Sequence, residues 1–213
     1  MTLPQARDRP RPLLVTDCDE VLLHMVSHFS DWLDEAHAIA FRPEEGDMAG
    51  ALKFKTTGER VPTDRVWDYL GGFFHTEMHR QTLVPGALDA LGAIGEVADI
   101  VILTNLGDEA HGWRVEQLAG HGIHHEVVCN RGGKGEPLKR LVERHGAPRS
   151  VFVDDLAVHH ASVAKHSPET FRLHMVAEPK LAAVTQAAPA AHARIDEWPA
   201  ATQWILDHLK DAA

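Results

Sequence analysis

Two acidic residues, Asp17 and Asp19, stand at the end of an apolar run, in the stretch LLVTDCDEVLL over residues 13–23. Burying a carboxylate is costly unless a cation, a set of backbone donors or a reacting group accompanies it. Any of these three would make the placement reasonable. An Asp here can be a metal ligand or a nucleophile that forms an aspartyl-phosphate. A second carboxylate two residues on can protonate a leaving oxygen and later activate water.

Other apolar segments of the chain also end in chemically useful side chains. The segment IVILTN ends in Thr104 and Asn105, VFVDD ends in Asp154 and Asp155, and RGGKGEP, which follows EVVCN, carries Lys134. The acidic pair, together with the first acid of the opening stretch, can supply oxygen ligands to Mg²⁺, which usually takes a few carboxylates, waters and a substrate phosphate. A lysine and a threonine hydroxyl can hold phosphoryl oxygens and offset their charge.

Five short apolar segments rich in Val and Ile predict strands that are covered on both faces. They span residues 13–18, 100–105, 126–130, 151–155 and 171–176. Amphipathic helical stretches separate them, and this alternation predicts an α/β fold with a parallel sheet and helices on both faces. Ligands of such sheets bind outside the carboxyl ends of the strands, so the polar side chains named above are expected to meet at one edge.

One interval, between the first strand and Pro85, lacks a buried-strand signal and reads as an insertion. It contains two stretches of helical periodicity and, around Thr57 and Gly58, an apolar–polar alternation that predicts a hairpin. Its aromatic residues Trp67 and Phe73, with the neighbouring Phe74, are interpreted as core of the insertion rather than as a substrate platform. The predicted domains are a mobile N-terminal tail (1–12), an α/β core (13–22 and 84–213) and a small, mostly helical cap (23–83).

Composition excludes several classes of function. The 213 residues include 21 basic and 31 acidic ones, giving a net charge of −10, and no basic stripe is present to neutralise nucleic-acid phosphates. No run is long enough to span a membrane. The two cysteines, Cys18 and Cys129, are interpreted as reduced thiols of a cytoplasmic protein.

Four motifs, in order, on four predicted strand ends resemble those of the haloacid dehalogenase superfamily, in its phosphohydrolase branch. The stretch DCDEVL is similar to the first motif, D-x-D-x-[TV]-[LV], and Thr104, Lys134 and VFVDD are similar to the second, third and fourth. The resemblance covers the chain apart from its N-terminal tail, and the cap lies where the family carries a C1 cap. Glu20 stands where many members have glycine, which we interpret as a subgroup feature that can alter the turn after the strand.

The resemblance implies a Rossmann-like core and a role for each motif residue. Asp17 would be the nucleophile, and Asp19 the general acid and base, with its backbone carbonyl on the metal. Asp154 would be the main metal ligand of the fourth motif, while Asp155 would bind directly or through water. The residues implied to bind the substrate phosphate are Thr104, Asn105 and Lys134, and those implied to bind Mg²⁺ are Asp17, Asp19, Asp154 and Asp155.

The function expected from this resemblance is that of a Mg²⁺-dependent phosphohydrolase, acting on a small phosphorylated metabolite through an aspartyl-phosphate, as a monomer or homodimer. A phosphomutase keeps both acids of the first motif and remains an alternative. A 2-haloacid dehalogenase of the same fold normally lacks the second acid, so Asp19 argues against it. A non-catalytic binding protein would be supported by loss of a motif residue, and none is lost. The substrate and the cap residues that select it are left open.

Overall fold

The computed structural model describes residues 10–42 and 50–210 and is built around a six-stranded parallel sheet. Its order is β10-β9-β8-β1-β6-β7. The strands are β1 (Leu13–Thr16), β6 (Asp99–Thr104), β7 (Glu126–Cys129), β8 (Ser150–Asp154), β9 (Phe171–His174) and β10 (Ala193–Arg194). The predicted parallel α/β class and all five predicted strands are confirmed. The sixth strand was not predicted because two half-buried residues give no periodic signal.

The first strand, β1, lies between β6 and β8, and all four of its residues are buried. From β1 the chain crosses to β6 and β7 on one side and then returns to β8 on the other. This reversal of direction makes a topological switch point beside the carboxyl end of β1, which is where open α/β sheets bind their ligands.

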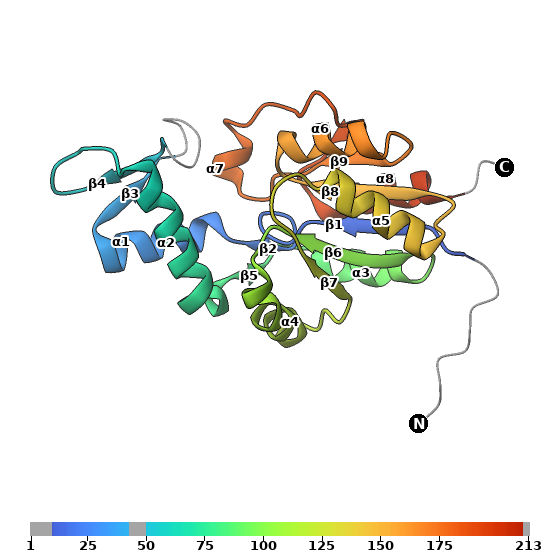
Figure 1. Ribbon diagram of the computed structural model, residues 1–213, viewed down its shortest axis with the longest axis horizontal. Coiled ribbons are helices and arrows are strands. Elements are labelled where there is room, and N and C mark those ends of the chain that lie inside the picture. Colours follow the sequence, from blue (N-terminus) through green and yellow to red (C-terminus); the bar gives the residue numbers. More distant parts are fainter. Residues whose placement is uncertain (1–9, 43–49, 211–213) are drawn as a thin grey trace.

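Helices cover both faces of the sheet (Figure 1). On one face, α3 and α8 pack on each other and, with Leu118 of α4, close a large apolar cluster. On the other, α5 and α6 enclose a second cluster around Phe152 of β8. The elements are α3 (Ala87–Gly95), the 3₁₀ turn η3 (Asp108–Ala110), α4 (His111–Gly120), α5 (Gly135–His145), α6 (Ala157–His166), α7 (Pro179–Ala182) and α8 (Trp198–Leu209).

The insertion forms a separate layer, seen at the left of Figure 1, with an apolar cluster of its own. Its elements are α1 (Val26–His37), β3 (Ile39–Phe41), β4 (Leu52–Phe54), α2 (Thr63–Thr76) and the 3₁₀ turn η2 (Met78–Arg80). The predicted turn at Thr57 and Gly58 is present, because the amide of Phe54 donates to the carbonyl of Glu59 at 2.9 Å. The antiparallel pairing of β4 with β3 was not predicted.

Two short strands, β2 (Leu23–His24) and β5 (Thr82–Leu83), pair antiparallel where the chain leaves and re-enters the core. They lie next to the predicted limits of the cap, 23 and 83, and these limits stay a prediction. Of the predicted tail, residues 1–9 lie outside the described residues, as do 43–49 and 211–213. Arg11 is held by the core, since its Nη2 donates to the carbonyl of Gly95 at 2.7 Å.

Both cysteines are free thiols in the structure, Cys18 buried and Cys129 partly buried. Among the helices of residues 10–42 and 50–210, none has both the length and the apolar character that a membrane crossing requires.

Candidate active site

Asp17 lies directly after β1, at the switch point of the sheet. Its amide donates to the carbonyl of Val153 at 2.8 Å, which continues the pairing of β1 with β8 for one residue. Its carboxylate accepts from the amide of Cys18 at 2.7 Å and pairs with Lys134 Nζ at 2.8 Å. The same Nζ lies 2.7 Å from Asp154 Oδ2 at the end of β8. A single buried lysine therefore bridges the acids of two neighbouring strands.

Three of the predicted acids converge. Carboxylate oxygens of Asp17, Asp154 and Asp155 lie within 4.8 Å of one another. Burial, with the charge of neighbouring acids, raises the pKa of Asp17 to about 7 and raises that of Asp155 well above its usual value, while burial raises the pKa of Asp154. One lysine cannot neutralise three carboxylates. Carboxylate oxygens that cluster with excess negative charge are suitable ligands for a hard divalent cation, and these three residues would hold it.

Lys134 precedes the first turn of α5, and close contact between α5 and α6 fixes its position. A Cβ added to Gly135 would lie 2.2 Å from the carbonyl oxygen of Ser162, so α5 can approach α6 this closely only with glycine there. Although burial opposes it, the charges of Asp154 and Asp17 raise the pKa of Lys134. Lys134 therefore stays charged in a fully buried position.

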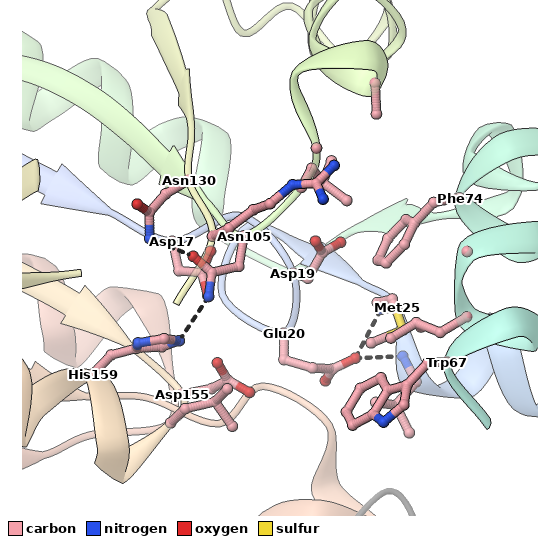
Figure 2. Close-up of a pocket in the computed structure, with 18 of the residues that line it drawn as sticks. Asp17, Asp19, Glu20, Met25, Trp67, Phe74, Asn105, Asn130, Asp155 and His159 are labelled. Atoms are coloured by element: carbon pink, nitrogen blue, oxygen red, sulfur yellow. Dashed lines mark hydrogen bonds between the residues drawn. The ribbon is translucent and has the colours of Figure 1, made fainter. Parts of the chain in front are cut away.

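The end of β6 provides the predicted hydroxyl and amide. The Oγ1 of Thr104 is fully buried and finds no hydrogen-bond partner among the described residues. Buried hydroxyls are normally bonded, so this one is available to a ligand. Asn105 lines the cavity (Figure 2), where its Oδ1 accepts from Asn130 Nδ2 at 2.9 Å and its Nδ2 donates to the carbonyl of Gly132 at 3.0 Å.

The Asp19 carboxylate does not join the acidic cluster. Its two oxygens each lie 2.9 Å from Nη2 of Arg114, which is fully buried on α4, and Oδ1 also accepts from Gln81 Nε2 at 2.7 Å. Gln81 precedes β5, so Asp19 is tied to the segment that leads from the cap back to the core. Sequence analysis missed Arg114 and Gln81. In a single sequence, a buried arginine of an amphipathic helix looks like any surface arginine.

Glu20 has the left-handed backbone conformation, with φ of 59°, that favours glycine. Its Oε1 accepts from the amides of Met25 and Val26, at 2.7 and 2.6 Å, where α1 begins. Burial raises the pKa of Glu20 to about 7. The glutamate that stands here in place of glycine therefore links the turn after β1 to the first helix of the cap.

His159, which sequence analysis gave no role, also lines the cavity (Figure 2). Its Nε2 lies 3.3 Å from Asn105 Nδ2. Burial, with the charge of Lys134, lowers the pKa of His159 to about 4, so the ring is neutral at ordinary pH. His160 points elsewhere, its Nε2 lying 2.9 Å from the carbonyl oxygen of Asp154. Sequence analysis searched the ends of the predicted strands, and His159 lies instead in the first turn of α6.

A cavity of about 1180 Å³ lies between cap and core, and the site residues described above that line it include Asp17, Asp19, Glu20, Asn105, Asn130, Asp155 and His159. Phe73 is buried in the cap core as predicted. The expectation for Trp67 was wrong, because its side chain is 56% exposed on the cavity wall, and Phe74 also lines the wall. Val66 and Phe73 lie on the side of α2 that packs into the cap core, whereas Trp67 and Phe74 lie on the side that faces the cavity.

No family model matches the sequence, and comparison with curated proteins finds no match. Solved structures do match. A hydrolase of the haloacid dehalogenase-like family from Streptococcus pneumoniae is 11% identical, with a TM-score of 0.62, covering 90% of this chain and 97% of that one. A haloacid dehalogenase-type hydrolase of Bacillus subtilis, solved with magnesium, is 12% identical, with a TM-score of 0.62 and coverage of 92% and 99%. A Thermotoga maritima protein assigned as a β-phosphoglucomutase is 13% identical, with a TM-score of 0.59 and coverage of 92% and 98%.

At these identities the likeness establishes the fold. The chain has the haloacid dehalogenase-like fold, as the four sequence motifs implied, with a Rossmann-like parallel sheet and a second layer inserted after the first strand.

Proposed function

We propose that this protein is a Mg²⁺-dependent phosphohydrolase that acts on a small phosphorylated metabolite through an aspartyl-phosphate. The observation that carries the proposal is the cluster at the switch point. There, Asp17, Asp154 and Asp155 converge within 4.8 Å, a charged Lys134 contacts two of them, and the neighbouring strand ends in Thr104. Carboxylates, a cation and a hydroxyl together match the needs of phosphoryl transfer.

In the proposed reaction, an Asp17 carboxylate oxygen attacks the phosphorus, and the bond to the leaving oxygen breaks. Asp19 gives a proton to that oxygen. In the second half, Asp19 accepts a proton from water, which attacks the phosphorus of the aspartyl-phosphate, releasing inorganic phosphate and restoring Asp17. Two side chains, Arg114 and Gln81, donate three hydrogen bonds to the Asp19 carboxylate, and Oδ2, which accepts only one of them, keeps a lone pair on which the proton can be carried.

The other residues bind and orient the phosphoryl group. Thr104 Oγ1 and the Asn105 amide donate hydrogen bonds to its oxygens, and the Lys134 ammonium offsets their charge. Mg²⁺ held by Asp17, Asp154 and Asp155, with the Asp19 backbone carbonyl, would neutralise further phosphoryl charge. Its free cysteines support a location in the cytoplasm, and we propose that it acts as a monomer or homodimer.

A phosphomutase uses the same two acids, and one of the similar structures is assigned as such. The structure does not favour it over a phosphohydrolase, since the two differ in whether the phosphoryl group passes to water or to a second substrate hydroxyl. Sugar-phosphate isomerisation without phosphate release would identify the mutase.

The proposal is tested by p-nitrophenyl phosphate turnover with Mg²⁺, with EDTA and in the Asp17→Asn variant. We expect phosphate release with Mg²⁺ and little in the other two samples. Full phosphate release in EDTA would contradict the metal requirement. Near-native turnover by folded Asp17→Asn protein would exclude the covalent mechanism.

A further inference from the structure

Apolar side chains that face solvent gather around the cavity. Trp67 of α2 and Trp113 of α4 are 56% and 41% exposed, and Leu156 and Val184 are exposed on the core side. These four are half of the eight large apolar side chains exposed in the described part of the chain, and all four line the cavity. Apolar groups that are concentrated in one place mark a binding surface. The same cavity is lined by Asp17, where the phosphoryl group of a substrate would bind. The apolar side chains would therefore contact the organic part of that substrate.

The charged side chains of the cavity are mainly acidic. They include the carboxylates of Asp17, Asp19, Glu20, Glu109 and Asp155. Arg131 is the one lysine or arginine among the described lining residues, and its Nη2 already lies 3.0 Å from Glu109 Oε1. Asp17, Asp19 and Glu109 each pair with a lysine or arginine, and Asp155 belongs to the proposed metal cluster. Glu20 is the lining carboxylate for which the described residues provide no cation, so a cationic group of the ligand would be attracted to it.

One of these carboxylates has an unused acceptor. Glu20 is 1% exposed, and its Oε1 already serves the amides of Met25 and Val26. Its Oε2 is buried, finds no partner among the described residues, and belongs to a side chain on the cavity wall (Figure 2). A buried carboxylate oxygen without a donor is unfavourable unless a ligand supplies one. Glycine at this position would adopt the same backbone conformation without strain, and the hydrogen bonds to the start of α1 use only Oε1, so Oε2 is the atom that requires an explanation.

We propose that the substrate is a phosphomonoester with an apolar, aromatic organic part and a primary ammonium group, and that Glu20 Oε2 accepts a hydrogen bond from that ammonium. This inference rests on the phosphohydrolase function proposed above. It makes Glu20 a specificity-determining residue, while Trp67 and Trp113 contact the aromatic portion.

Three esters test the proposal on the wild-type protein with Mg²⁺: 2-amino-3-phenylpropyl phosphate, 3-phenylpropyl phosphate and glucose 6-phosphate. The first two differ in one amino group. A charge-assisted hydrogen bond predicts that kcat/KM is about tenfold higher for the amino ester than for its partner. Glucose 6-phosphate should be hydrolysed less efficiently than either phenyl ester, because its polar body cannot cover the apolar wall.

Two variants test which side chains cause these substrate preferences. In Glu20→Gln, the oxygen that holds α1 is kept and the second oxygen becomes an amide donor, so the ratio of kcat/KM between the two phenyl esters should fall to near one. In Trp67→Ala, the advantage of both phenyl esters over glucose 6-phosphate should shrink. Leu88→Ala is the matched control, since Leu88 is exposed on α3 away from the cavity, and it should leave all three kcat/KM values unchanged.

The results distinguish a wrong substrate class from a wrong enzyme function. Hydrolysis of all three esters with no preference for the amino ester, or a preference retained in folded Glu20→Gln protein, would overturn this inference and leave the phosphohydrolase function standing. If neither these esters nor p-nitrophenyl phosphate were hydrolysed, the proposed function would be wrong and the inference would be overturned with it.

Discussion

A single nitrogen of Arg114, Nη2, lies 2.9 Å from both carboxylate oxygens of Asp19. The guanidinium is fully buried, and its other terminal nitrogen contacts the side chains of Gln81, Gln117 and Cys18. Arg114 therefore fixes the orientation of Asp19 from α4, a helix that carries none of the sequence motifs. It is a positioning residue for the proposed acid and base.

The first prediction concerns this pair. Arg114→Leu leaves Asp19 without its cation, with Gln81 as its remaining donor, and breaking a buried ion pair should lower the free energy of unfolding by about 3–5 kcal/mol. Arg114→Lys should be milder, because it keeps the charge. Chemical unfolding of both variants gives these values, and the double variant with Asp19→Leu should be less destabilised than the sum of the two single variants.

The same variants separate positioning from a purely structural role. With Asp19 misplaced, kcat for an alkyl phosphate, whose leaving oxygen needs a proton, should fall more than kcat for p-nitrophenyl phosphate. Unchanged kcat on both substrates in folded Arg114→Lys protein would show that Arg114 acts on stability alone, and equal losses on both would show that it does not act through proton transfer by Asp19.

The second prediction concerns the contact that places Lys134. In Gly135→Ala, the added methyl would meet the Ser162 carbonyl, so α5 must shift and the protein should lose about 1–3 kcal/mol of stability, together with most of its activity. Gly92→Ala is the matched control, because this exposed glycine of α3 has open space around it and alanine should stabilise the helix by about 0.5–1 kcal/mol. Unaltered stability and turnover in Gly135→Ala would contradict the packing argument.

The acids of β1 and β8 were predictable, because parallel strands bring their carboxyl ends to one edge whatever the details of packing. Arg114, Gln81 and His159 were not, because they reach the site from helices and a linker, whose placement depends on long-range packing. The exposure of Trp67 toward the cavity was likewise set by tertiary structure, since helical periodicity alone cannot say which apolar side chains remain uncovered.

The third prediction concerns the metal and needs no activity assay. A ligand that binds only the folded state stabilises it by about 2.7 kcal/mol at a hundredfold excess over Kd, so Mg²⁺ should raise the Tm of the wild-type protein. Asp155→Asn should remove most of that rise. Glu109→Gln, which alters a cavity acid outside the cluster, should retain it. The metal assignment would be wrong if both variants responded to Mg²⁺ equally.

The fourth prediction concerns acid sensitivity in metal-free protein. Burial lowers the pKa of His160 to about 4, so between about 6.5 and 4 the unfolded chain binds a proton here that the folded protein does not. Its contribution to stability is therefore present above pH 6.5 and is lost as the pH falls toward 4, by up to about 3 kcal/mol. Unfolding measured across this range should show a smaller acid loss in His160→Gln than in wild type. His79→Gln is the control for removing an exposed imidazole, and an unchanged acid loss in His160→Gln would contradict the prediction.

If Asp17 carries the phosphoryl group and Asp19 moves the protons, the two acids can be distinguished by the intact mass of acid-quenched protein during p-nitrophenyl phosphate turnover. In Asp19→Asn, the good leaving group departs without help, but hydrolysis of the aspartyl-phosphate lacks its base. We predict that this variant accumulates a mass increase of one phosphoryl group and that Asp17→Asn shows none. An unphosphorylated Asp19→Asn protein that turns over poor-leaving-group esters as well as wild type would show that Asp19 is not the acid and base. A phosphorylated Asp17→Asn protein would show that Asp17 is not the nucleophile.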